Sequence, residues 1–142
     1  MEQEKVKHHK DYPEEYITGK VIFFGREFHV TPDVLIPRLE TESLVRRARE
    51  AQKNLNFECI VDIGCGSGII GTSLADLVDE VIFLDISEWA IQVAEKNFRR
   101  YYPDKSAQFI VWDLLTNFSF WEGKRFLFLA NLKYIKKDDW EH

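Results

Sequence analysis

The order of apolar and polar positions along the chain predicts strands and helices in alternation. Four short apolar runs bounded by turn residues predict strands over about 59–63, 81–85, 107–111 and 125–130. Apolar residues at helical spacing predict helices over about 68–78 and 88–101. Ser87 is the expected N-cap of the second helix, and its inward positions are predicted to be Ile91, Ala94 and Phe98.

The first third of the chain follows another pattern. Residues 20–30 are typical of a hairpin, with a turn predicted at Gly25-Arg26, and Thr41 is expected to cap a helix over about 42–55. The inward face of that helix is predicted to hold Leu44, Val45, Ala48 and Leu55. We therefore divide the chain into a flexible lead (1–15), a hairpin and lid segment (16–40) and an α/β core (41–142).

The strand ends carry the polar residues. Strands that alternate with helices form parallel sheets, and such sheets bind ligands at the carboxyl ends of their strands. In this chain those ends are 62–68, Asp85, Asp113 and Asn131. The Asp85 carboxylate can accept hydrogen bonds from both hydroxyls of a ribose. The pattern therefore predicts a nucleoside-binding site at one edge of the sheet.

A glycine-rich loop follows the first of these strands. Gly66, Gly68 and Gly71 fit the dinucleotide fingerprint, while Asp62 with Gly64, Gly66 and Gly68 fits the loop that binds S-adenosylmethionine. The position of Asp62 favours the second interpretation, because a carboxylate repels a pyrophosphate and suits a ligand with an ammonium group and a sulfonium. S-adenosylmethionine is thus preferred to NAD.

Composition narrows the class of partner. The chain has 142 residues, 45% of them hydrophobic, which is enough for one domain with a buried core. A formal net charge of −5 argues against direct binding of nucleic acid. Cys59 and Cys65 lack the spacing and neighbours of a zinc site, and no apolar run reaches the length of a membrane span. A reducing cytoplasm is the expected location.

Segments outside the glycine loop match one family. They are 16–19, Phe24-Gly25, 28–30, 34–42 and 84–87, with Ala90, Ala94 and Asn97. On these residues and on 62–68 the chain resembles the HemK/PrmC-type protein-(glutamine-N5) methyltransferases, which modify peptide-chain release factors. Segment 34–42 is similar to the family's proline-arginine-x-glutamate-threonine-glutamate segment, with Leu39 in place of a usual proline. The resemblance covers about residues 16–140.

This resemblance implies a Rossmann-like class I methyltransferase fold, with strand order 3-2-1-4 after the hairpin. It also implies S-adenosylmethionine as the cofactor and a release factor as the protein substrate, with no metal. Asp85 would hold the ribose and Asp113 the adenine. The implied cofactor-binding residues are Asp62, Gly64, Gly66, Gly68, Asp85, Ile86, Asp113 and Leu114.

The family's signature after the fourth strand is asparagine-proline-proline-tyrosine, and here the sequence reads Asn131-Leu132-Lys133-Tyr134. The resemblance implies that the Asn131 side-chain oxygen and the Leu132 carbonyl accept the two N–H groups of a glutamine amide. They would turn its nitrogen toward the methyl group, with Tyr134 beside it. Asn131 and Tyr134 are the expected catalytic residues, and Leu132 joins them in substrate binding. Lys133 replaces a rigid proline.

Departures from the family keep other functions open. The family has a helical domain before the hairpin and further strands after the tyrosine, so the chain is expected to be truncated. Residues 126–129 then form an apolar edge strand, through which we predict self-association. A non-catalytic relative that binds S-adenosylmethionine, or only a protein partner, is the alternative. An adenine N6 methyltransferase is a less favoured one.

Overall fold

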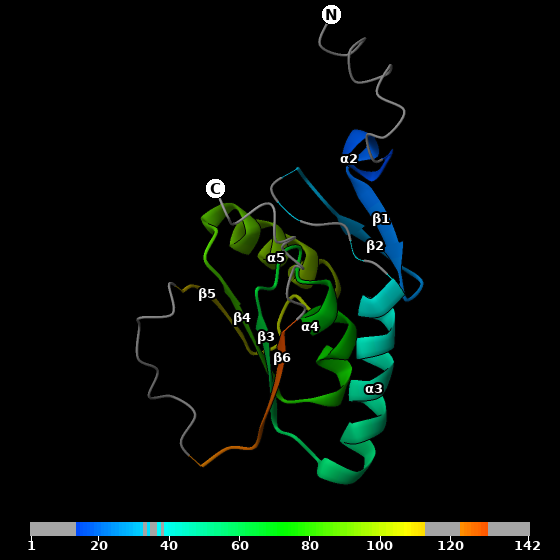
Figure 1. Ribbon diagram of the computed structural model, residues 1–142. Coiled ribbons are helices and arrows are strands. Elements are labelled where there is room, and N and C mark those ends of the chain that lie inside the picture. The colour runs from blue at the N-terminus through cyan, green and yellow to red at the C-terminus, as the bar shows by residue number, and fades with distance from the viewer. Residues whose placement is uncertain (1–13, 33, 35–36, 38, 113–122, 131–142) are drawn as a thin grey trace, which may run out of the picture.

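A four-stranded parallel sheet forms the centre of the computed structural model, which describes residues 14–32, 34, 37, 39–112 and 123–130 (Figure 1). Its strands lie in the order β5 (Ala107–Val111), β4 (Glu80–Asp85), β3 (Cys59–Ile63) and β6 (Phe126–Ala130). This confirms the predicted order 3-2-1-4. Ile63 lies opposite Leu84 and Ala130, so the carboxyl ends of β3, β4 and β6 share one edge.

Helices cover one face of this sheet. Helices α4 (Ile69–Leu74) and α5 (Glu88–Tyr101) pack on the strands, and α3 (Leu39–Leu55) packs on α4 (Figure 1). The Ser87 hydroxyl accepts the Ala90 N–H at 3.2 Å, which confirms the predicted cap of α5. Its three predicted inward residues are buried.

Two helix boundaries differ from the prediction. The α-helix predicted over 68–78 ends at Leu74 and continues as a 3-10 turn, η1 (Ala75–Leu77). Side chains of α3 bind carbonyls of both elements: Arg49 donates to Ser73 O in the last turn of α4, and Gln52 donates to Leu77 O at the end of η1. Helix α3 starts at Leu39, so Thr41 lies buried in its first turn and is not its cap.

The predicted inward face of α3 is correct except at its end. Val45 and Ala48 are buried and Leu44 packs against the core, but Leu55 is 54% exposed. In the last turn, Gln52 faces the following loop and exchanges two hydrogen bonds with the backbone of Phe57. The helix therefore ends on a polar contact, and Leu55 lies outside the core.

The hairpin consists of β1 (Lys20–Phe23) and β2 (Arg26–His29), which pair in antiparallel fashion after a short helix, α2 (Glu14–Thr18). Its turn is Phe24-Gly25, one residue before the predicted position, because Phe23 pairs with Arg26. Both turn residues have positive φ, 48° and 73°, as two-residue hairpin loops of type I′ require. The sequence pattern did not predict α2.

Apolar side chains fill both faces of the sheet. On the helical face Phe83 stacks on Phe109 at 5.0 Å between ring centroids and meets Phe98 edge-on. On the other face a second buried cluster contains Cys59, Val61, Ile82 and Leu84. In the described part of the chain β6 is an edge strand with Phe128 half exposed, while self-association through it stays a prediction.

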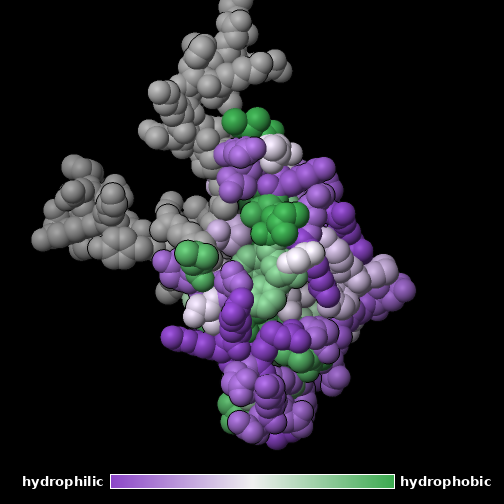
Figure 2. Space-filling view, turned by 90° about the vertical axis from the view of Figure 1, so that its right-hand side faces the viewer, coloured by the Kyte–Doolittle hydropathy of each residue, from purple (hydrophilic) through white to green (hydrophobic). Residues whose placement is uncertain are grey.

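The surface around the hairpin is mixed. Figure 2 looks at this side and shows apolar side chains among mostly polar ones. Four large apolar residues of α2, β1 and α3 are more than half exposed: Ile17, Ile22, Leu39 and, at the end of α3, Leu55. Over the described ranges, the helices are too short or too polar to cross a membrane.

Candidate functional site

The glycine loop joins β3 to α4 at the carboxyl edge of the sheet. Gly64, Gly66 and Gly68 have positive φ angles of 65°, 54° and 78°, which side-chain-bearing residues rarely adopt. Cys65 N–H donates to Leu84 O at 2.9 Å, which fixes the loop against the end of β4. Within the loop, Gly68 N–H donates to Cys65 O at 2.8 Å and closes a turn.

The outer glycines, Gly64 and Gly66, border open space. A Cβ built on either one meets no atom of the described residues within 4 Å. Nothing in the packing of the described chain therefore requires glycine at these two positions, apart from the backbone angle. The bare backbone leaves room for a ligand to approach closely.

The inner glycines, Gly68 and Gly71, are needed for packing. A Cβ on Gly68 would lie 2.9 Å from the Ala94 Cβ and 3.0 Å from its Cα, and one on Gly71 would lie 2.5 Å from a Phe83 ring atom. Gly71 thus allows α4 to pack closely on β4. Because the same role is played by the third glycine of dinucleotide loops, Gly71 does not discriminate between the two cofactors.

Asp85, at the end of β4, connects the loop to the start of α5. Its Oδ2 accepts the Gly66 N–H at 3.0 Å, and its Oδ1 accepts the Ser87 N–H at 2.9 Å. A carboxylate can accept about four hydrogen bonds. Each oxygen therefore retains a lone pair for a ligand after fixing the backbone around it.

Asp62 lies deeper, in β3, and is 1% exposed. Its Oδ2 accepts the Gly71 N–H at 3.0 Å, in the first turn of α4, whose N-cap Gly68 has no side chain to offer. Its Oδ1 has no hydrogen-bond partner in the described part of the structure. Burial raises the pKa of Asp62 to about 8; the Gly71 N–H opposes this rise, and the charge of Asp85 adds to it.

The remaining predicted residues fall into two groups. Ile86 follows Asp85 and is 75% exposed, an apolar side chain beside the loop. The others lie outside the described residues, in the sequence that comes after β5 or after β6: Asp113, Leu114, Asn131, Leu132 and Tyr134. The structure therefore brings together Asp62, the three loop glycines, Asp85 and Ile86.

Sequence reasoning on the site missed the role of Asn97. This residue of α5 is 2% exposed, and its amide contacts both the glycine loop and the hairpin. The signal available in the sequence is a polar residue on the inward face of a helix, between Ala94 and Phe98. A buried amide of this kind must find hydrogen-bond partners.

The cysteines offer no reactive thiol. Burial raises the pKa of Cys59 to about 12 and the pKa of Cys65 well above its ordinary value, so both stay protonated at neutral pH. No cluster of three metal-ligating side chains occurs within the described ranges.

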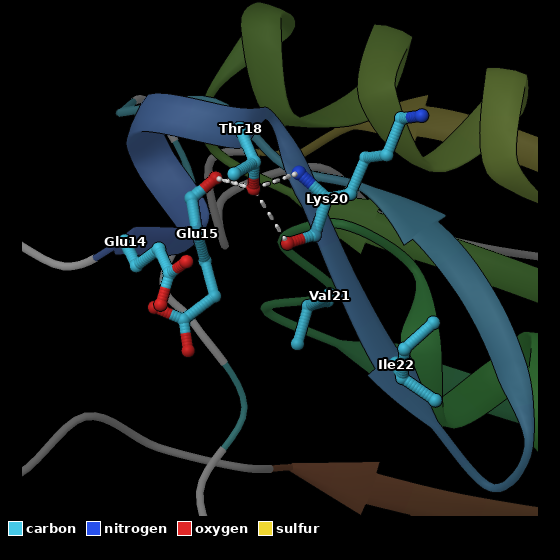
Figure 3. A pocket seen from close by; sticks show the side chains of 6 residues that line it. All are labelled: Glu14, Glu15, Thr18, Lys20, Val21 and Ile22. Carbon is cyan, nitrogen blue, oxygen red and sulfur yellow. Dashed lines mark hydrogen bonds between the residues drawn. The ribbon is translucent and has the colours of Figure 1, made fainter.

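A shallow pocket lies away from the glycine loop, between α2 and β1. It is lined by Glu14, Glu15, Thr18, Lys20, Val21 and Ile22. Figure 3 shows that the Thr18 hydroxyl is already engaged by backbone groups of Glu15 and Lys20. None of these residues belongs to the loop or to the strand ends, so this pocket plays no part in the site.

Known proteins match the chain in sequence. The protein-family model described as "Methyltransferase domain" matches residues 60–142. The release factor glutamine methyltransferase of Borreliella burgdorferi is 37% identical over 133 residues, which are 93% of this chain and 46% of that protein. The corresponding protein of Bacillus subtilis is 37% identical over 138 residues, again 93% of this chain and 47% of the relative. The chain thus spans about half the length of these curated relatives.

Solved structures share the fold. The 16S rRNA N2 G1207 methyltransferase of T. thermophilus, in complex with AdoMet and guanosine, aligns over 82% of this chain and 32% of its own, with a TM-score of 0.62 and 19% identity. A tRNA (uracil-54, C5)-methyltransferase of Pyrococcus abyssi aligns over 66% of this chain and 23% of its own, with a TM-score of 0.51 and 23% identity. The chain belongs to the methyltransferase-domain family and is a relative of the release factor glutamine methyltransferases.

Proposed function

We propose that the chain binds S-adenosylmethionine at the glycine loop. The observation that carries this proposal is the open backbone of Gly64 and Gly66 beside Asp85, whose carboxylate fixes the loop and keeps acceptor sites free. Such a cradle suits a nucleoside with two hydroxyls. Membership of the methyltransferase-domain family supports the same cofactor.

Each residue of the cradle has a distinct proposed role. Asp85 would accept hydrogen bonds from the ribose, and the exposed Ile86 would contact the adenine. The free Oδ1 of Asp62 would face the ammonium group of the ligand, which favours the ionised carboxylate. Asp113 and Leu114 would complete the adenine side. The cofactor supplies an electrophilic methyl group on a sulfonium.

The proposed substrate is the side-chain amide of a glutamine in a peptide-chain release factor. The names of the relatives and the residues that follow β6 support it. Asn131 and the Leu132 carbonyl would accept both N–H groups of the amide and orient its nitrogen, with Tyr134 packed beside it. The new N–C bond would form as the S–CH3 bond breaks and leaves its electron pair on sulfur, and the nitrogen would lose one proton. A protein substrate agrees with the net charge of −5. A cytoplasmic location stays a prediction.

Calorimetric titration tests the cofactor. Micromolar binding of S-adenosylmethionine to the wild-type chain is expected. Asp85→Ala should weaken it about tenfold or more, because two ribose hydrogen bonds to a charged acceptor are lost. Asp79→Ala, at an exposed position before β4, is the control and should bind as the wild type does. Absence of heat with the folded wild-type chain would refute the proposal.

Methyl transfer tests the chemistry. A release-factor fragment with its target glutamine, and the same fragment with alanine there, would be offered to the wild-type chain and to Lys133→Pro. Transfer to the glutamine fragment alone supports the enzyme. Cofactor binding without transfer in either variant supports the second candidate, a binding relative without catalysis. That candidate is motivated by Leu132-Lys133 in place of two prolines.

A further inference from the structure

The outer edge of β2 is covered by helix α5. Val30 N–H donates to Gly19 O at 3.0 Å, so the backbone groups of Val30 face β1. Because these groups alternate in direction along an antiparallel strand, those of His29 and Glu27 face away from β1. These groups require partners elsewhere, and α5 supplies them for both groups of His29 and for Glu27 O.

Two α5 side chains one turn apart bind two strand residues that are two apart. The Asn97 Oδ1 accepts the His29 N–H at 2.7 Å, and its Nδ2 donates to His29 O at 2.8 Å. The Tyr101 hydroxyl donates to Glu27 O. Four helical residues rise ~6 Å and two strand residues ~6.6 Å, so the spacings match. Asn97 thus pairs with His29 much as a neighbouring strand would.

Asn97 has a further contact that Tyr101 lacks. Its Nδ2 also donates to Ser67 O at 2.8 Å, in the glycine loop. One turn earlier on the same helix, Ala94 lies directly against Gly68. Both donors of a single buried amide are therefore used, one toward the hairpin and one toward the loop.

We propose that Asn97 is a positioning residue that couples the hairpin to the cofactor loop. This inference rests on the proposed binding of S-adenosylmethionine. A ligand that fixes the loop fixes Ser67 O and hence the orientation of the Asn97 amide, which in turn holds His29. The coupling is reciprocal, so an ordered hairpin strengthens cofactor binding.

The coupling extends past the hairpin. Val30 and Val34 share a buried cluster with Ala90 and Val93 of α5. The Tyr16 hydroxyl donates to Val34 O at 2.6 Å, which ties the segment after the hairpin to α2. Val34, after the hairpin, is thus attached to the same helix that contacts the loop.

Amide hydrogen exchange of the full chain, with and without S-adenosylmethionine, tests this inference. The ligand should slow exchange in residues 64–68 and also at the Val30 N–H. We expect about fivefold or more, the lower end of coupling between two sites. Asp79 N–H, which donates to Glu58 O near the amino ends of the strands, reports general stabilisation and should slow less.

Two variants separate positioning from simple anchoring. In Asn97→Ala the ligand should no longer slow Val30 exchange, and S-adenosylmethionine affinity should fall about tenfold. In Tyr101→Phe, which loses a hairpin bond without touching the loop, both effects should persist. Where the alanine variant does not fold, Asn97→Asp replaces it, since a carboxylate keeps the acceptor for the His29 N–H and loses the donors to His29 O and Ser67 O.

The outcomes are distinct. Unchanged exchange in residues 64–68 of the wild-type chain would refute cofactor binding itself. Protection of the loop without protection of Val30 would overturn the coupling alone. The coupling would also be overturned if the ligand protected Val30 equally in the Asn97 variant and in the wild type. It would likewise be overturned if Tyr101→Phe lost this protection as fully as the Asn97 variant does.

Discussion

Glycines and an aspartate occur both in the inner half of the glycine loop, which packs on the core, and in its outer half, which borders open space, but they serve different purposes there. In the inner half, Gly68 and Gly71 have no room for a side chain, and Asp62 is buried against α4. In the outer half, Gly64 and Gly66 border open space and Asp85 keeps acceptor sites free. The motif therefore combines residues that packing requires with residues that leave room for a ligand.

This difference separates stability from binding. Substitutions in the inner half should mainly lower the stability of the fold, whereas those in the outer half should cost less stability and mainly weaken ligand binding. A sequence motif does not show which glycines are needed for packing and which for ligand binding, because the residue type is the same. The space around each Cα in the structure distinguishes the two roles.

Gly68→Ala should cause the largest loss of stability. The new Cβ combines ~1 kcal/mol of backbone strain with about 1–3 kcal/mol of overpacking against Ala94. Urea unfolding should show a loss of about 2–4 kcal/mol. Gly66→Ala, with open space and only the strained angle, is the control and should lose about 1 kcal/mol. Equal losses in both variants would contradict the contrast.

Asp62→Asn should change how stability depends on pH. Between its ordinary pKa of 3.8 and its folded pKa of about 8, the folded chain holds a proton on Asp62 that the unfolded chain has lost. The stabilisation by Asp62 is thus complete below the lower value and disappears as the pH rises through the upper one. Asparagine cannot ionise. Between about pH 5 and pH 8 the free energy of unfolding of the Asp62→Asn variant should therefore fall less than that of the wild type. The difference over this range should be on the order of a few kcal/mol.

Asp76→Asn is the control for this measurement. Arg49 holds the pKa of Asp76 below its ordinary value, so Asp76 is ionised in both states over the same range. Its replacement should leave the slope unchanged. If Asp62→Asn also left the slope unchanged, Asp62 would be ionised in the folded chain.

Gly64→Ala should weaken the ligand more than the fold. The strained φ costs about 1–2 kcal/mol of stability, while a methyl group in the cradle should reduce S-adenosylmethionine affinity about tenfold or more. Gly25→Ala is a matched control, since Gly25 also has positive φ and open surroundings but lies in the hairpin turn. Calorimetry should find unchanged affinity there. Similar affinity in both variants would place the ligand elsewhere.

Binding of S-adenosylmethionine near pH 7 should release up to one proton. An ammonium group near Asp62 stabilises its carboxylate and lowers its pKa, so the proton held in the free chain leaves. Calorimetry in two buffers of different ionisation enthalpy measures this number. Asp62→Asn should release none. If the wild-type chain released no proton on binding, the proposed contact between Asp62 and the ammonium group would be wrong.

Much of this architecture follows from the sequence. Apolar runs located β3 and β4 to within one residue, because strands buried on both faces leave a continuous signal. The run of β5 located that strand as well, although its side chains are only partly buried or exposed. The turn of the hairpin was wrong by one residue, since Phe24 adopts a positive φ that its side chain disfavours. The predicted end of α4 was wrong; there Arg49 of α3 binds Ser73 O in the last turn of α4 and Gln52 binds Leu77 O at the end of η1, and such tertiary contacts leave no local pattern.

The residues of the site could be predicted from the sequence, but the contacts that hold them in place could not. Asp85 and the loop glycines were expected side by side, and the parallel register places them so. The support of α4 by Asp62, nine residues before Gly71, and the amide of Asn97 between two segments were not expected. Such contacts depend on side-chain directions after folding, which no local pattern encodes.

The position of Asn97 in the chain has a consequence during synthesis. It lies 68 residues after His29. At about 5–20 residues per second, the ribosome completes the hairpin roughly 3 to 14 seconds before it adds Asn97. A hairpin of two strands forms within ~10 μs and is marginally stable alone. The nascent hairpin therefore opens and closes many times with the backbone of His29 exposed, and it becomes permanent only when α5 has been made.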